Sequence, residues 1–266
     1  MASGPESGHA VDRSGTYSFP ASGYAWRVIA DLPVIAGFGE RRQESNRTIS
    51  ASMENAASVR PLRPAKGTTP GMSIFEGAAE RAAFLEEHGV SYAVLGGLAV
   101  QHWGEPRATQ DVDILVMVPS QREQDFLNAA AQRFRPRLPD AVAFAVRHRV
   151  LLLSASGGTP IDISLGIPGY EEEVMRRAVS VSFPGLRSVR VVSAEDLLIH
   201  KCVAGRARDV EDVERILVRQ RLCLDLRYIR RWLRAFAGIV EGHDVRAVFE
   251  TAVKKTRATL RKGKKR

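Results

Sequence analysis

The stretch from Tyr92 to Val118, YAVLGGLAVQHWGEPRATQDVDILVMV, constrains the fold more than any other part of the chain. It predicts a strand, a turn, a short helix, a loop and a second strand, because an apolar run precedes the pair Gly96 and Gly97 and two aspartates open the next apolar run. Side chains alternate between the faces of a strand, so Asp111 and Asp113 are expected on one face. Two carboxylates on one face predict a site for a divalent metal ion.

The glycine pair adds a second expectation. Gly96 and Gly97 are expected to open a helix from Gly97 to Trp103, directly after a strand from Tyr92 to Leu95. The first N–H groups of a helix lack partners within the helix, and the helix dipole adds positive potential there, so such a turn favours phosphate. Metal and phosphate together indicate nucleotide chemistry. Each feature has an alternative interpretation. A glycine pair often forms only a tight turn, and an aspartate pair on a strand often lies at a solvated edge.

Composition is compatible with a folded core and excludes several classes. The chain has 266 residues, 44% of them hydrophobic, and its two cysteines, Cys202 and Cys223, are too few for a disulfide framework and are predicted to be buried thiols. No apolar run approaches the roughly 18 residues of a membrane-spanning helix, and no secretory leader is recognisable, so a cytoplasmic location and no membrane partner are expected. The net charge of +9 allows attraction to polyanions, and much of the excess lies in the tail 254–266, which fits a solvated helix end or an RNA contact.

The order of elements predicts an α/β fold, a small mixed sheet flanked by helices and followed by a helical C-terminal part. We expect residues 1–71 to be disordered or not natively translated, residues 72–192 to form the α/β core, and residues 193–266 to form helices with a basic tail. Capping boxes at Ser73 and Ser120, and Ser193 followed three residues later by Asp196, predict helix starts. The expected helices are 73–88, 97–103, 120–134, 171–179, 193–205, 209–219, 225–238 and 244–260, and the expected strands are 92–95, 111–118, one or two runs in 142–153, 161–165 and 189–192.

These residues resemble a known family. The strand, the Gly96 and Gly97 turn, the Asp111 and Asp113 pair and a lone Asp162 on a later strand resemble the minimal core of the polymerase-beta-like nucleotidyltransferases. The segment SAEDLLIHKCVAGRARDVEDVERIL, 193–217, looks like the helical part of the AbiEii-type toxin and antitoxin-associated members. The family pattern places a serine after the first glycine. Here Gly97 stands at that position.

The resemblance implies transfer of an NMP unit from an NTP to an acceptor hydroxyl with two Mg²⁺ ions. Asp111 and Asp113 would be the shared metal ligands, and Asp162 would complete the metal site and help take up the acceptor proton. Magnesium suits hard oxygen ligands and phosphates. Asp162 could instead cap the hairpin turn at Gly157 and Gly158.

The resemblance also implies a nucleotide site in the helical part. Gly96, Gly97 and Arg107 would contact the triphosphate, although Arg107 could equally be a surface loop arginine. The resembling toxins use a lysine and a downstream aspartate here, which correspond to Lys201 and Asp209. Asp209 could instead be the N-cap of its helix.

Three functions remain open at this stage. The leading one is an Mg²⁺-dependent nucleotidyltransferase acting on the 3′ end of tRNA or on a protein, in a toxin–antitoxin system with a cognate toxin or antitoxin as partner. The second is a catalytically silent member that binds nucleotide, RNA or a partner toxin. The third, a sugar-nucleotide glycosyltransferase using the aspartate pair, fits less well because the domain is small and the glycine pair lies close upstream.

Overall fold

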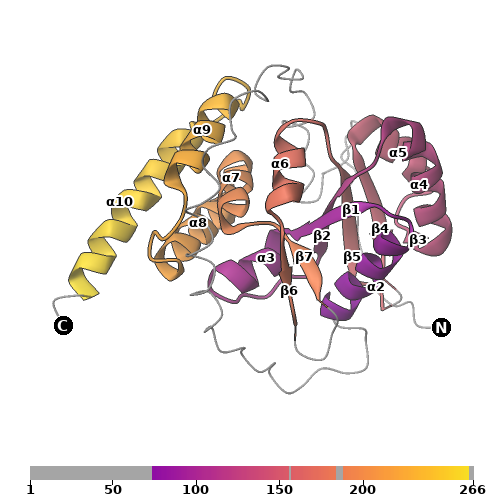
Figure 1. Ribbon diagram of the computed structural model, residues 1–266, viewed down its shortest axis with the longest axis horizontal. Helices are drawn as coiled ribbons and strands as arrows, with labels where there is room; N and C mark the ends of the chain where they lie inside the picture. The colour runs from indigo at the N-terminus through magenta and orange to yellow at the C-terminus, as the bar shows by residue number, and fades with distance from the viewer. Residues whose placement is uncertain (1–73, 156, 184–187, 264–266) are drawn as a thin grey trace, which may run out of the picture.

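The computed structural model describes residues 74–155, 157–183 and 188–263, in which the chain forms a seven-stranded mixed sheet flanked by helices (Figure 1). The predicted α/β class is confirmed. The expectations for residues 1–71 and for the Ser73 cap lie outside these residues. The sheet order is β3-β4-β5-β2-β1-β7-β6. The division into two parts at residue 192 stays a prediction.

The elements follow the predicted order closely. The strands are β1 (Ser91–Leu95), β2 (Val112–Met117), β3 (Arg135–Pro136), β4 (Val150–Ser154), β5 (Pro160–Leu165), β6 (Val179–Val181) and β7 (Val189–Val191). The helices are α2 (Ile74–Glu87), α3 (Gly96–Trp103), α4 (Ser120–Arg133), α5 (Ala141–His148), α6 (Tyr170–Arg177), α7 (Ala194–Ala204), α8 (Ala207–Arg219), α9 (Leu226–Phe236) and α10 (Val245–Gly263).

The centre of the sheet is β2, which pairs antiparallel with β1 and parallel with β5. Val112 and Ile114 are fully buried, as predicted, and each such side chain contributes about 1.5–3 kcal/mol by leaving water. The side chains on the opposite face of β2 and β5 are buried as well, because Asp113 is 7% exposed and Asp162 only 1%. The acidic face of these strands is therefore enclosed by the protein.

Of the one or two extended runs predicted within 142–153, one is found as β4, but residues 142–148 are not a strand. These residues form α5, which packs against α4 and β4. The alternation of alanine with larger residues imitates a strand, but Ala141 and Ala145, four residues apart, are both buried and form the packed side of a helix. The helix ends at Arg149, which has a left-handed φ of 58°. His148, predicted on a strand, is the last residue of α5.

The Ser120 capping box is also wrong. The N-cap of α4 is Pro119, without a side-chain hydrogen bond, and Ser120 is the first helical residue. Glu123 instead accepts two hydrogen bonds from Arg149, at 2.9 and 2.7 Å, so a tertiary ion pair replaces the local cap. Two short strands, β3 and β6, were not predicted. Cys202 is buried, but Cys223 is exposed in the turn before α9.

Helices α7 to α10 gather on one side of the sheet, beside α3, while α4 and α5 lie at the other (Figure 1). The start and end of α7 follow the prediction. The Ser193 hydroxyl accepts a hydrogen bond from the Asp196 N–H, and Gly205 ends the helix with φ of 63°. Among the described residues, no helix combines the length and the hydropathy needed to cross a bilayer.

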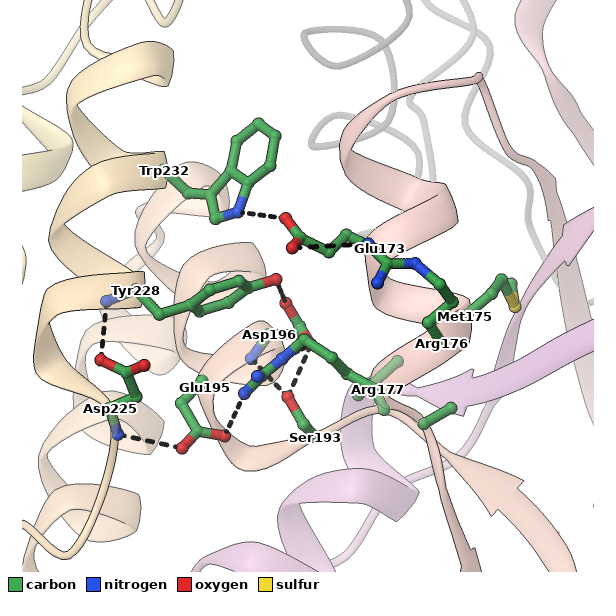
Figure 2. Close-up of polar contacts among 12 residues, drawn as sticks. Glu173, Met175, Arg176, Arg177, Ser193, Glu195, Asp196, Asp225, Tyr228 and Trp232 are labelled. Carbon is green, nitrogen blue, oxygen red and sulfur yellow. Dashed lines mark hydrogen bonds and ion pairs between the residues drawn. The ribbon is translucent and has the colours of Figure 1, made fainter. Parts of the chain in front are cut away.

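A buried polar network holds α7 against α6 and α9 (Figure 2). Its centre is Asp196, which is fully buried and accepts hydrogen bonds from the hydroxyls of Tyr228 at 2.7 Å and Ser193 at 2.6 Å. Arg177 of α6 donates to the same carboxylate at 3.2 Å. Burial raises the pKa of Asp196, although these partners favour its charged form. Because α7 also carries Lys201 one turn beyond, this network sets where that lysine lies.

The buried carboxyl of Glu171 predicts a pH-dependent stability. Its Oε2 accepts a hydrogen bond from the Ile167 N–H at 2.6 Å, and burial raises its pKa from 4.5 to about 8. The folded chain therefore holds this proton more tightly than the unfolded chain. The free energy of unfolding should decrease as the pH rises from about 4.5 to 8, and then level off.

Denaturant unfolding of Glu171→Gln at several pH values tests this expectation. The variant keeps the acceptor oxygen and should lose the decrease between pH 4.5 and 8. The neighbouring Glu172→Gln removes an exposed carboxyl and should keep the wild-type slope. An unchanged slope in Glu171→Gln would contradict the prediction.

Candidate functional site

A pocket lies where the start of α3, the start of β2, the loop between them, one side of α7 and the start of α8 come together. Its volume is about 160 Å³, below the roughly 300 Å³ at which pockets for complete small molecules begin. The predicted residues that line it are Gly96, Gly97, Arg107, Asp111, Asp113, Lys201 and Asp209.

Asp113 and Gly96 are placed together by strand register. Asp113 pairs with Leu95 across the β1–β2 ladder, so its side chain lies over the residue that follows, Gly96. A Cβ built on Gly96 would lie 1.8 Å from Asp113 Oδ2, and Gly96 has φ of 61°. Both the space and the backbone conformation therefore require glycine. The first glycine of the pair makes room for the carboxylate.

Asp111 lies just before β2, and its carboxylate reaches the same pocket. The Thr109 hydroxyl donates to Asp111 Oδ1 at 2.9 Å and holds it there. The sequence did not indicate this contact, although threonine hydroxyls often bond to nearby backbone groups, as Thr109 also does with the Asp111 carbonyl at 3.4 Å.

Asp162 does not line the pocket. It pairs with Asp113 in the parallel β2–β5 ladder, so the two carboxylates share a side of the sheet. Its Oδ1 accepts from the guanidinium of Arg137, which follows β3. Asp162 is not a cap of the Gly157 and Gly158 turn, because it lies inside β5. No local pattern around Arg137 indicated this ion pair.

Lys201 of α7 is the centre of a charged cluster with α8. Its Nζ contacts Asp209 Oδ1 at 2.7 Å and Asp212 Oδ2 at 3.0 Å, and all three side chains are buried. Arg206 donates to the second oxygen of Asp209 at 2.6 Å. Asp209 is therefore not the N-cap of α8, which is Arg206. Its carboxylate orients the lysine and the arginine instead.

Arg107 completes this cluster from the loop before β2. Its Nε and one Nη each donate to Asp212 at 2.9 Å, a two-pronged contact that ties the loop to α8. Burial alone would raise the pKa of Asp212, but Arg107 and Lys201 outweigh it and hold that pKa below its usual value. Sequence reasoning missed Asp212. Its spacing could have revealed it, because Asp212 lies three residues after Asp209 and therefore on the same, apolar side of α8.

The pocket carries more positive than negative groups from the helices. Arg206 and Arg208 line it beside Lys201, and Arg208 is exposed. His200 also lines it, and burial followed by the Lys201 charge lowers the pKa of His200 to about 3. His200 is thus neutral at physiological pH. The cations that line the pocket are Arg107, Lys201, Arg206 and Arg208, and the first three are paired with Asp209 or Asp212.

Asp111 and Asp113 fit a hard divalent cation, because both carboxylates reach the pocket and carboxylate oxygen is a preferred ligand of Mg²⁺. Within the described ranges, no group of three or more His, Cys, Asp or Glu side chains is arranged to hold a metal ion without other ligands. An ion bound by two aspartates would take its remaining ligands from substrate phosphates and water, as magnesium commonly does.

No protein-family model and no curated protein matches the sequence. The structure is similar to a nucleotidyltransferase-like protein of Paracoccidioides brasiliensis, with a TM-score of 0.39 and 16% identity over 65% of this chain and 90% of that one. It is also similar to the lincosamide antibiotic adenylyltransferase LnuA, with a TM-score of 0.33 and 14% identity over 52% and 92% of the two chains. For the CCA-adding enzyme of Thermotoga maritima the TM-score is 0.34 and the identity 14%, over 71% of this chain and 48% of that one. Resemblances this distant do not assign a family.

Proposed function

We propose that this chain is an Mg²⁺-dependent nucleotidyltransferase that moves an NMP unit from an NTP to an acceptor hydroxyl. The observation that carries the proposal is the convergence of Asp111 and Asp113, the uncapped start of α3 and the Lys201 cluster on one small pocket. Carboxylates suit a cation, while free helix N–H groups and basic side chains suit phosphate. A triphosphate with its metal needs both.

Basic and acidic groups of the pocket would bind different parts of the substrate complex. The first N–H groups of α3, with Lys201 and Arg206, bind and orient the triphosphate. Asp111 and Asp113 would hold the magnesium, which when bound neutralises charge on the phosphate oxygens. Asp162 takes up the acceptor proton in this proposal, which requires Arg137 to release it. The acceptor is the 3′ end of tRNA or a protein hydroxyl, within a toxin–antitoxin system of the AbiEii type.

The proposal is tested by incubating the purified protein with each of the four α-labelled NTPs, Mg²⁺ and a cell extract. Label in RNA or protein, released pyrophosphate and loss of both with a chelator are expected. The chelated sample without added Mg²⁺ is the matched control. Absence of Mg²⁺-dependent NTP binding to the protein, measured directly, would overturn the proposal.

A catalytically silent binding protein is the second candidate. The ion pair between Asp162 and Arg137 favours it, because the carboxylate proposed as the proton acceptor is already neutralised. Such a protein would bind an NTP with Mg²⁺ and release no pyrophosphate. Measuring binding and pyrophosphate separately distinguishes the two candidates.

A further inference from the structure

The side chain of Thr109 fills the space above Gly97. A Cβ built on Gly97 would lie 2.2 Å from Thr109 Oγ1, 2.5 Å from its Cβ and 3.1 Å from its Cγ2. Unlike Gly96, Gly97 is not among the residues with positive φ, so its backbone would accept any L-residue. Space alone excludes a side chain at position 97. The Thr109 side chain therefore occupies the volume that a side chain at position 97 would need.

The loop that carries Thr109 is held from two helices. Arg107 is paired with Asp212 of α8, and Arg208 of α8 donates to the Ala108 carbonyl at 2.8 Å. Gln101 of α3 donates to the Arg107 carbonyl at 3.2 Å. These contacts fix the backbone of the two residues before Thr109. The position of its hydroxyl is therefore set by tertiary contacts.

The Thr109 hydroxyl also lies between the two halves of the pocket. It donates to Asp111 Oδ1 at 2.9 Å on one side and lies against the first turn of α3 at Gly97 on the other. The N-cap of α3, Leu95, offers no side-chain acceptor to the N–H groups of that turn. A hydroxyl has one proton to donate and can accept as well. It can therefore turn from Asp111 toward a phosphate oxygen when a cation occupies the carboxylate.

We propose that Thr109 is a triphosphate-binding residue, and that Gly97 is glycine so that this hydroxyl, delivered from the loop before β2, can reach the start of α3. The inference rests on the proposed function, because it assigns a further contact to the same NTP. It predicts that a hydroxyl carried by a side chain at position 97 can replace the one carried at position 109. It also makes Thr109 a positioning residue for Asp111.

Binding of each NTP with Mg²⁺ to the wild-type protein and five variants tests this inference by calorimetry. Thr109→Val keeps the shape without the hydroxyl and should weaken NTP binding about tenfold or more, whereas Thr109→Ser should stay within about threefold of wild type. Gly97→Ser alone should weaken binding through the clash. The double variant Gly97→Ser with Thr109→Ala should bind better than Thr109→Ala alone, because the hydroxyl returns from the other side.

The outcomes distinguish failure of the proposed function from failure of the role assigned to Thr109. No NTP binding by the wild type would overturn the proposed function and this inference together. Wild-type binding with an unchanged Thr109→Val would overturn the inference alone. A double variant no better than Thr109→Ala would likewise exclude an exchangeable hydroxyl. If Gly97→Ser fails to fold, the Val and Ser variants at position 109 still decide, since they introduce no added volume.

Discussion

Asparagine at both Asp111 and Asp113 is expected to reduce the rate of NMP transfer by about a thousandfold, the scale on which loss of a preorganised electrostatic contact slows an active site. The amide has the shape of the carboxylate but lacks the charge that a divalent cation requires. Asp113 is nearly buried beside Gly96, so the isosteric change leaves the packing intact. Steady-state rates at saturating Mg²⁺ and NTP measure the effect.

The matched control for this double variant is Asp125→Asn on the exposed side of α4. It changes the same chemical group away from the pocket and should retain full activity. Thermal unfolding should show that the double variant is as stable as the wild type, because a carboxylate near the protein interior loses its desolvation cost when it becomes neutral. A stable double variant with undiminished transfer would refute the metal role.

Asp196→Ala is expected to lower the free energy of unfolding by about 3–5 kcal/mol, the usual cost of removing one partner from a buried ion pair. The carboxylate is fully buried and satisfies the hydroxyl of Tyr228 and the guanidinium of Arg177. Alanine would leave the Tyr228 hydroxyl without this buried acceptor and Arg177 with Glu195 as its remaining carboxylate partner. Urea unfolding followed by circular dichroism measures the loss.

Two milder variants provide the comparison. Asp225→Ala removes the carboxylate that caps α9 by accepting from the Arg227 and Tyr228 N–H groups, and should cost about 1 kcal/mol. Tyr228→Phe removes one hydroxyl from Asp196 and should fall between the two. A loss for Asp196→Ala no greater than that for Asp225→Ala would contradict a central role for the network drawn in Figure 2.

Elements with a strong local signal were predictable. The helix α7 has both of its ends in the sequence, a serine whose hydroxyl caps the first turn and a glycine that takes a left-handed conformation. The strands β1, β2 and β5 are short apolar runs bounded by turn residues. Their observed bounds differ from the predicted ones by a residue or so at each end. In both cases the information lies within a few residues, so no distant contact has to be known.

The errors arose where a distant partner overrides the local pattern. Residues 142–148 alternate like a strand, but α4 and β4 offer a surface that two alanines one turn apart can pack against. Glu123 was assigned to a cap because Ser120 lies three residues away. Arg149, from beyond α5, pairs with it instead. Neither partner can be identified from the residues nearby.

The sequence by itself determined the spacing of the glycine pair and the two aspartates, because strand alternation and helix starts are local properties of the backbone. Only the tertiary structure decided which side chains lie against each of them. Register across β1 and β2 brings Asp113 over Gly96, and the tie between Arg107 and Asp212 places Thr109 over Gly97. The second glycine, which in the sequence looked like the loss of a hydroxyl, is the space for one that arrives from elsewhere in the chain. Side chains far apart in sequence compete for one volume, and only the packed chain settles which of them occupies it.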